Sequence, residues 1–169
     1  FNRLSYTKVT LPALIKNAGA EFKLTIVDNG STDGTIEYLK KISCKYKEYI
    51  RNILFLDKNY GISIPTNEFW KNSRADFLGK VDNDTLCPDK WLSRLLNAHI
   101  LSTSKILGVI GGFHFNLGYI NLEYLKKRVC SFSGTSLIPD SHIGGCCYLF
   151  RRSLQRKIGY LCLGDKLTH

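Results

Sequence analysis

Two aspartates separated by one residue give the clearest chemical signal in this 169-residue chain. Asp82 and Asp84 follow the mostly apolar segment 77–81, which has the character of a short β-strand. Alternate positions of a strand face the same side, so both carboxylates are expected to point into one crevice. Neighbouring carboxylates repel each other, and their oxygens suit Mg2+ or Mn2+ shared with phosphate groups. The alternative interpretation is a polar turn that only ends a strand.

A second acidic position follows another predicted strand. Residues 24–27 are rich in strand-forming types, Asp28 stands at their end, and Asn-Gly and Asp-Gly pairs then predict a tight turn. Apolar residues at helical spacing predict a helix over residues 35–42. Helix N-termini favour anions, and acidic side chains at strand ends bind nucleosides in other folds. Asp28 therefore either ends its strand or contacts a ligand, whereas Asp33 is interpreted as a helix cap.

A third polar cluster follows a third predicted strand. Lys58, Asn59 and Gly61 lie in a turn after the apolar residues 53–56, and a helix is predicted around residues 66–73. The alternation of strands and helices predicts an α/β fold with a mostly parallel sheet. The carboxyl ends of parallel strands share one edge, so the three polar clusters are expected to converge.

These motifs resemble those of family 2 glycosyltransferases of the GT-A fold. The similar segments are the nucleotide-binding motif at 27–35, the asparagine–glycine loop at 59–62, the D-x-D motif with its following helix at 81–92, and the glycine pair with its strand and helix at 144–159. The first three residues are similar to the loop that follows the family's first strand. The resemblance implies a single domain over residues 1–169, a Rossmann-like α/β/α sandwich with a mainly parallel central sheet.

The resemblance also implies roles for individual residues. The implied nucleotide contacts are Asp28, Asn59, Gly61, Asp82 and Asn83, with Lys58 as a secondary candidate. Asp84, together with Asp82, is implied to hold Mg2+ or Mn2+ against the diphosphate. Gly144 and Gly145 are implied to shape the acceptor side, where a larger side chain would obstruct close approach. A bend at a strand edge is the alternative explanation of this glycine pair.

The implied activity is transfer of a sugar from a nucleoside-diphosphate sugar, with UDP or dTDP favoured, to a hydroxyl of a saccharide, lipid-linked or protein acceptor. The resemblance implies inversion at the anomeric carbon by direct displacement, with the metal neutralising charge on the leaving diphosphate. The family's first strand would precede Phe1, and the acidic general base is expected beyond His169, so we expect a domain incomplete at both ends. Asp165 does not stand in the family's context for that base. A non-catalytic sugar-nucleotide-binding domain is the alternative.

Composition leaves a further alternative open. The formal net charge is +10, and a basic nucleic-acid-binding module would share this feature. The basic clusters are spread over several predicted helices without a recognition motif, so no nucleic-acid partner is expected. Solvated helix faces or peripheral contact with an anionic membrane surface also account for the charge.

Hydrophobic content and the cysteine pattern bear on the size of the core and on the location of the protein. With 44% hydrophobic residues the chain can bury one substantial core, and its sequence has no apolar run of membrane-spanning length. Six cysteines without a C-x-x-C pair indicate buried free thiols and a cytoplasmic location, with peripheral contact at the inner membrane face as an option. Residues 106–115 predict a buried strand, and residues 131–141 predict an irregular surface connection.

Overall fold

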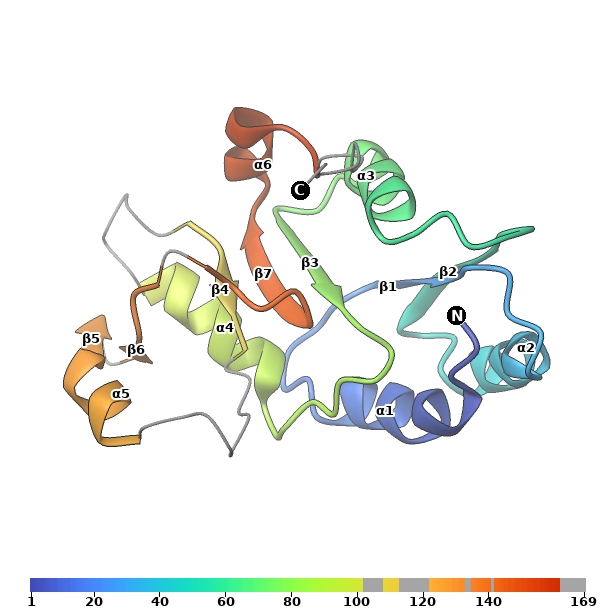
Figure 1. Ribbon diagram of the computed structural model, residues 1–169, viewed down its shortest axis with the longest axis horizontal. Coiled ribbons are helices and arrows are strands. Elements are labelled where there is room, and N and C mark those ends of the chain that lie inside the picture. Colours follow the sequence, from blue (N-terminus) through green and yellow to red (C-terminus); the bar gives the residue numbers. More distant parts are fainter. Residues whose placement is uncertain (102–107, 113–121, 133–134, 141, 162–169) are drawn as a thin grey trace, which may run out of the picture.

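The computed structural model describes residues 1–101, 108–112, 122–132, 135–140 and 142–161. Helices and strands alternate along the first half of the chain (Figure 1). The described helices are α1 Leu4–Lys16, α2 Thr35–Lys45, α3 Ser63–Asn72, α4 Trp91–Leu101, α5 Leu122–Arg128 and α6 Arg152–Ile158. The described strands are β1 Leu24–Asp28, β2 Ile50–Phe55, β3 Phe77–Val81, β4 Ile110–Gly111, β5 Cys130–Phe132, β6 Thr135–Leu137 and β7 Cys147–Arg151.

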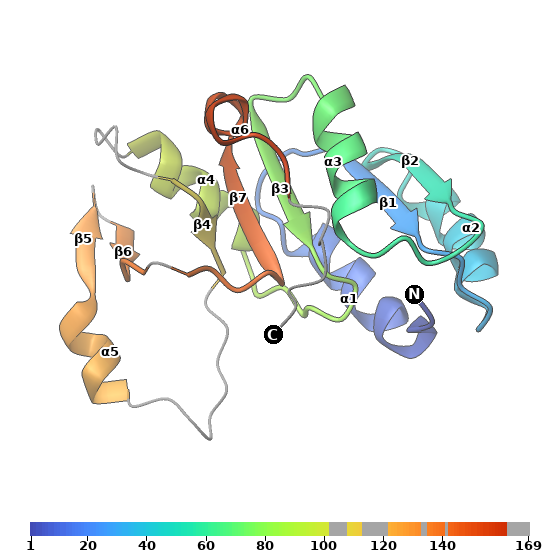
Figure 2. The same cartoon turned by 45° about the horizontal axis from the view of Figure 1, so that its top comes forward.

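The strands form a mixed set of sheets. β1 pairs with β2 in parallel, β7 pairs antiparallel with both β3 and β4, and β5 and β6 form a hairpin. The first three strands point the same way, so their carboxyl ends lie along one edge (Figure 2). The prediction of an α/β fold built by strand–helix alternation is therefore confirmed.

Helices cover both faces of these strands, which makes three layers. One core packs side chains of α1, α2 and α4, such as Leu14, Leu39 and Leu95, against β1 and β7. A second core on the opposite face joins α3 to β3 and β7 through Trp70, Leu78 and Phe150. The α/β/α sandwich follows from these two apolar clusters.

A cavity of about 810 Å³ separates β1 from β3. All of β1 and most of β3 line it, and helical residues such as Leu11 and Phe69 close it from both faces. Among the described strands, β1 is hydrogen-bonded only to β2, and β3 only to β7. The cavity thus lies between two strands of the layer. Asp28 and Asp82 line it at the carboxyl ends of these strands, and other charged residues, such as Glu21 and Asp76, line it at their amino ends.

Local predictions fared unevenly. The helices predicted over 35–42 and 66–73 are confirmed as α2 and α3, and α1 was not predicted. Interior proline normally argues against a helix, and Pro12 lies inside α1. The predicted irregular connection at 131–141 was wrong in part, because β5 and β6 pair there. Of the strand predicted over 106–115, only Ile110–Gly111 is observed, as β4; residues 108–109 and 112 are not in a strand, and 106–107 and 113–115 lie outside the described residues.

The cysteines were predicted to be free and buried; those in the described ranges are free, but they are not all buried. The five cysteines in the described ranges are all free. Cys87 and Cys147 are buried, whereas Cys44 and Cys130 are exposed because they lie at the surface of α2 and at the start of β5. Cys162 lies outside the described residues.

As for membranes, none of the helices in the described ranges has both the length and the apolar character needed to cross a bilayer.

Candidate active site

The loop after β1 is closed by the carboxylate that ends the strand. Asp28 is 3% exposed, and its Oδ2 accepts the backbone N–H of Ser31 at 2.8 Å. Gly30 has φ +77°, and a Cβ there would lie 2.8 Å from Cα of Lys58. Only glycine allows this approach, so the loops after β1 and β2 meet through their backbones.

Asn29 joins the same two loops through its side chain. Its Nδ2 donates to the carbonyl of Gly61 at 3.0 Å, and its Oδ1 accepts the N–H of Tyr60 at 3.3 Å. Within the second loop, Asn59 Oδ1 accepts the N–H of Gly61 at 2.8 Å. The structure thus brings the predicted residues Asp28, Asn59 and Gly61 to one edge. Asn29 was missed as a site residue, although it stands in the same sequence motif.

The two prominent aspartates lie in a turn rather than in a strand. β3 ends at Val81, and the N–H of Thr85 donates to the carbonyl of Asp82 at 3.1 Å. The alternation of a β-strand therefore does not orient the two carboxylates, and the expectation based on it was wrong. The Asp82 carboxylate instead pairs with Lys80 of β3, whose side chain is only 14% exposed.

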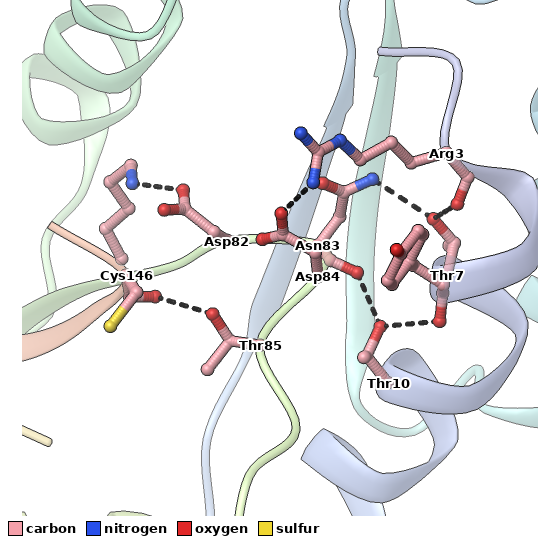
Figure 3. Close-up of polar contacts among 10 residues, drawn as sticks. Arg3, Thr7, Thr10, Asp82, Asn83, Asp84, Thr85 and Cys146 are labelled. Carbon is pink, nitrogen blue, oxygen red and sulfur yellow. Dashed lines mark hydrogen bonds and ion pairs between the residues drawn. The ribbon is translucent and has the colours of Figure 1, made fainter. Parts of the chain in front are cut away.

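Asp84 and Asn83 both point toward the first helix and the residues before it (Figure 3). The Asp84 carboxylate pairs with the guanidinium of Arg3. The side-chain Nδ2 of Asn83 donates to the hydroxyl of Thr7 at 3.2 Å, and the backbone carbonyl of Asn83 accepts the hydroxyl of Thr10 at 2.6 Å. The side chain of Asn83 is thus committed to α1, and its predicted nucleotide contact stays a prediction.

Asp33 fixes the starts of two helices. Its carboxylate accepts the N–H of Leu4 at 2.9 Å, at the start of α1, and the hydroxyl of Thr35 at 2.6 Å, at the start of α2. The hydrogen bond from Thr35, followed by that from Leu4, holds the pKa of Asp33 below its ordinary value. The interpretation of Asp33 as a helix cap was wrong in part, because the N-cap residue of α2 is Gly34. Asp33 stands one residue earlier, and its carboxylate also accepts the backbone N–H of Thr35 at 3.2 Å, so it anchors the start of α2 without being the N-cap.

The glycine pair lies beside the turn that carries Asp82. Lys80 Nζ donates to the carbonyl of Gly145 at 2.8 Å, and the N–H of Asp82 donates to the carbonyl of Cys146 at 2.8 Å. Among the residues that the structure describes, a Cβ at Gly145 would meet no atom within 4 Å, and one at Gly144 would meet only Cys146 Sγ, at 4.0 Å. The packing of the described residues therefore does not itself require glycine at either position.

The turn after β3 carries carboxylates of the kind that could help to hold a divalent cation. No cluster of three potential metal ligands occurs among the side chains that the structure describes. Mg2+ ordinarily takes one or two carboxylates and completes its shell with water and substrate phosphates. The hard oxygens of Asp84, whose side chain is 34% exposed, suit such a shared site. In this structure the Asp84 carboxylate is paired with Arg3. The ion pair is partly exposed, and such pairs contribute about 0–1 kcal/mol to the free energy of unfolding.

Comparison with solved structures supports the fold. A mannosyltransferase from Pyrobaculum calidifontis, PcManGT, solved with GDP-Man and Mn2+, superposes with a TM-score of 0.74 at 16% identity. The alignment covers 96% of this chain and 45% of that one. TarS of S. aureus, residues 1–349, gives a TM-score of 0.63 at 19% identity, with 94% and 47% of the two chains covered. The fold is that of the GT-A glycosyltransferases.

Sequence comparison gives the family. The glycosyltransferase TuaG of Bacillus subtilis (strain 168), named for teichuronic acid biosynthesis, is 24% identical over 135 residues, which are 80% of this chain and 42% of TuaG. YfnE of the same organism, an uncharacterized glycosyltransferase, is 30% identical over 79 residues, which are 47% of this chain and 19% of YfnE. The chain thus spans less than half the length of these relatives. Because the model of glycosyl transferase family 2 matches residues 1–159, the chain belongs to that family.

Proposed function

We propose that this chain forms the donor-binding part of an enzyme that transfers a sugar from a nucleoside-diphosphate sugar to an acceptor hydroxyl. The observation that carries the proposal is the convergence of three polar loops at one sheet edge. Asn29 ties the loop after β1 to the loop after β2. Residues 2–4 tie the loop after β1 to Asp84. Strand ends of open α/β sheets are where such folds bind nucleotides.

The proposed donor contacts follow from position at the strand ends and from hydrogen-bonding capacity. Asp28 lines the rim of the cavity, and its carboxylate is proposed to accept hydrogen bonds from a base or ribose. Asn59 and Gly61 are proposed to flank the nucleoside, and Lys58 lies beside them with Nζ 5.1 Å from the Tyr60 ring. UDP and dTDP remain the favoured nucleotides of the sugar donor, and GDP joins them because PcManGT was solved with GDP-Man.

Asp84, with Asp82 beside it, is proposed to hold Mg2+ or Mn2+ together with the donor diphosphate. A divalent cation held there would supply positive charge to stabilise the leaving diphosphate without proton transfer. Gly144 and Gly145 are proposed to leave room for the acceptor, which agrees with the open space beside Gly145. Inversion by direct displacement is the proposed stereochemistry. No general base is assigned among the side chains that the structure describes.

Calorimetric titration tests this function. UDP, dTDP and GDP are added to the chain with Mn2+ and then with excess EDTA, and a short oligonucleotide at the same salt concentration serves as a competing ligand. We expect one nucleotide to bind more tightly with Mn2+ than with EDTA. Salt-sensitive binding of the oligonucleotide without any nucleotide binding would contradict the proposal in favour of a basic nucleic-acid-binding module.

A further inference from the structure

Arg3 is held in place by its two neighbours in the chain. The backbone N–H of Asn2 donates to Ser31 Oγ at 2.9 Å, and the side-chain Oδ1 of Asn2 accepts the N–H of Thr32 at 2.8 Å. On the other side, the N–H of Leu4 donates to Asp33 at 2.9 Å. These bonds fix the Arg3 backbone against the loop after β1, so its side chain starts from a defined place beside the proposed donor site.

The Arg3 side chain bridges that loop and the turn after β3. Its guanidinium carbon lies 5.7 Å from the centre of the Tyr6 ring, and Nη1 pairs with Asp84 (Figure 3). The side chain is 50% exposed, so solvent and solutes reach it. A guanidinium presents five N–H donors in a planar fork that matches phosphate oxygens, and the contact with Asp84 engages a single nitrogen.

Both carboxylates of the turn after β3 are paired with basic side chains of the chain itself. The Asp82 carboxylate is paired with Lys80, and the Asp84 carboxylate is paired with Arg3. A divalent cation at Asp84 competes with Arg3 for the same carboxylate. A diphosphate arriving with that cation brings new negative charge within reach of the displaced guanidinium, which suits phosphate as well as carboxylate.

We propose that Arg3 exchanges partners during donor binding. It neutralises Asp84 in the donor-free chain, and it binds the diphosphate once a divalent cation takes Asp84. This inference rests on the proposed function and adds a diphosphate-binding residue from outside the turn that carries the aspartates. Removal of Arg3 should therefore have two opposite effects. The affinity for the metal should rise, because a competitor for Asp84 is lost, and the affinity for the diphosphate should fall, because one of its ligands is lost.

The test measures binding of Mn2+ alone, UDP and uridine to the wild-type chain and to Arg3→Gln. We expect Arg3→Gln to bind Mn2+ up to about fivefold more tightly, the range of a partly exposed ion pair. We expect the same variant to bind UDP with Mn2+ about tenfold more weakly, as for loss of a charge-assisted hydrogen bond. Uridine lacks the diphosphate, so its affinity should not change.

Two further variants separate this role from a structural one. Arg94→Gln removes the same charge from an exposed position on α4 and should leave all three affinities unchanged. Arg3→Lys keeps the charge without the planar fork, so its UDP affinity should lie between those of wild type and Arg3→Gln. Thermal unfolding of each variant shows whether α1 remains in place.

The outcomes are distinguishable. If Arg3→Gln weakens Mn2+ and UDP binding together, Arg3 only supports the fold of the loop, and the inference is wrong. If the wild-type chain binds UDP and Arg3→Gln leaves that affinity unchanged, the inference fails while the proposed function stands. If the wild-type chain binds neither UDP nor another nucleoside diphosphate, the proposed function fails and this inference falls with it.

Discussion

Two glycines with nearly the same backbone conformation differ in what surrounds them, and this contrast yields a quantitative prediction. Gly30 has φ +77° and Gly61 has φ +74°, so alanine at either position adopts a left-handed conformation. That conformation costs an L-residue about 1–2 kcal/mol. At Gly61 the new methyl group would meet no atom of the described part of the chain within 4 Å. We therefore expect Gly61→Ala to lower the free energy of unfolding by about 1–2 kcal/mol.

Gly30→Ala carries an additional steric cost. Its Cβ would lie 2.8, 3.0 and 3.1 Å from Cα, N and C of Lys58, and these backbone atoms cannot rotate aside as a flexible side chain can. Overpacking of this kind costs about 1–3 kcal/mol, which gives a total of about 2–5 kcal/mol for Gly30→Ala. The change should also separate the two loops joined by Asn29 and weaken nucleotide binding.

Urea denaturation of both variants and the wild type, followed by circular dichroism, measures the two losses. UDP titration on the same samples measures the effect on binding. Each glycine variant serves as the control for the other, because the cost of the left-handed conformation is common to both. Equal losses of stability would refute the claim that backbone contact with Lys58 is what requires Gly30.

Four more predictions concern single side chains. Asp84→Ala should abolish most of the gain in UDP affinity that Mn2+ provides, and an unchanged gain in calorimetry would show that the metal binds elsewhere. Asp28→Asn keeps an oxygen to accept the Ser31 N–H but removes the charge, so UDP binding in EDTA should weaken; unchanged affinity would mean that Asp28 only closes its loop. Burial lowers the pKa of His99 in the folded chain, so the unfolded chain takes up a proton first as pH falls. Stability should then decrease below pH ~6.5, the ordinary value for histidine, and urea unfolding at several pH values should show a smaller dependence for His99→Gln. Phe150→Ala should cost about 3–5 kcal/mol, because this side chain is 2% exposed in the core against α3; a loss under 1 kcal/mol in urea unfolding would contradict that packing.

The features that the sequence predicted well depend on local patterns. Residues at strand ends are marked by a change from apolar to polar types, which located Asp28 and the turn containing Asp82. When strands and helices alternate along the chain, successive strands point the same way. The sequence therefore predicted that Asp28, Asn59 and the turn containing Asp82 would lie at the same ends of their strands. Helical spacing likewise located α2 and α3, although the ends of elements differed by up to a few residues.

The features that escaped prediction depend on contacts between distant segments. β7 inserts antiparallel between β3 and β4, and no local pattern shows which strand a neighbour will choose. The pairing of Arg3 with Asp84 joins residues 81 positions apart, so the sequence did not reveal that the chain supplies its own cation there. The directions of the Asp82 and Asp84 side chains also escaped prediction, because the sequence left open whether these residues continue the strand or form the turn that ends it.

The central claim is that the three loops form one nucleotide-diphosphate site, and a nuclear magnetic resonance titration tests it most directly. The 1H–15N spectrum of the chain is followed as UDP and Mg2+ are added, and Mn2+ is then substituted for Mg2+. The account predicts that chemical-shift changes cluster at residues 28–33, 59–61 and 82–85, and that line broadening by Mn2+ is strongest around Asp84. The hairpin of β5 and β6, at the far end of the molecule from α2 (Figure 1), should be unaffected. Changes centred on that hairpin, or broadening remote from Asp84, would contradict the account.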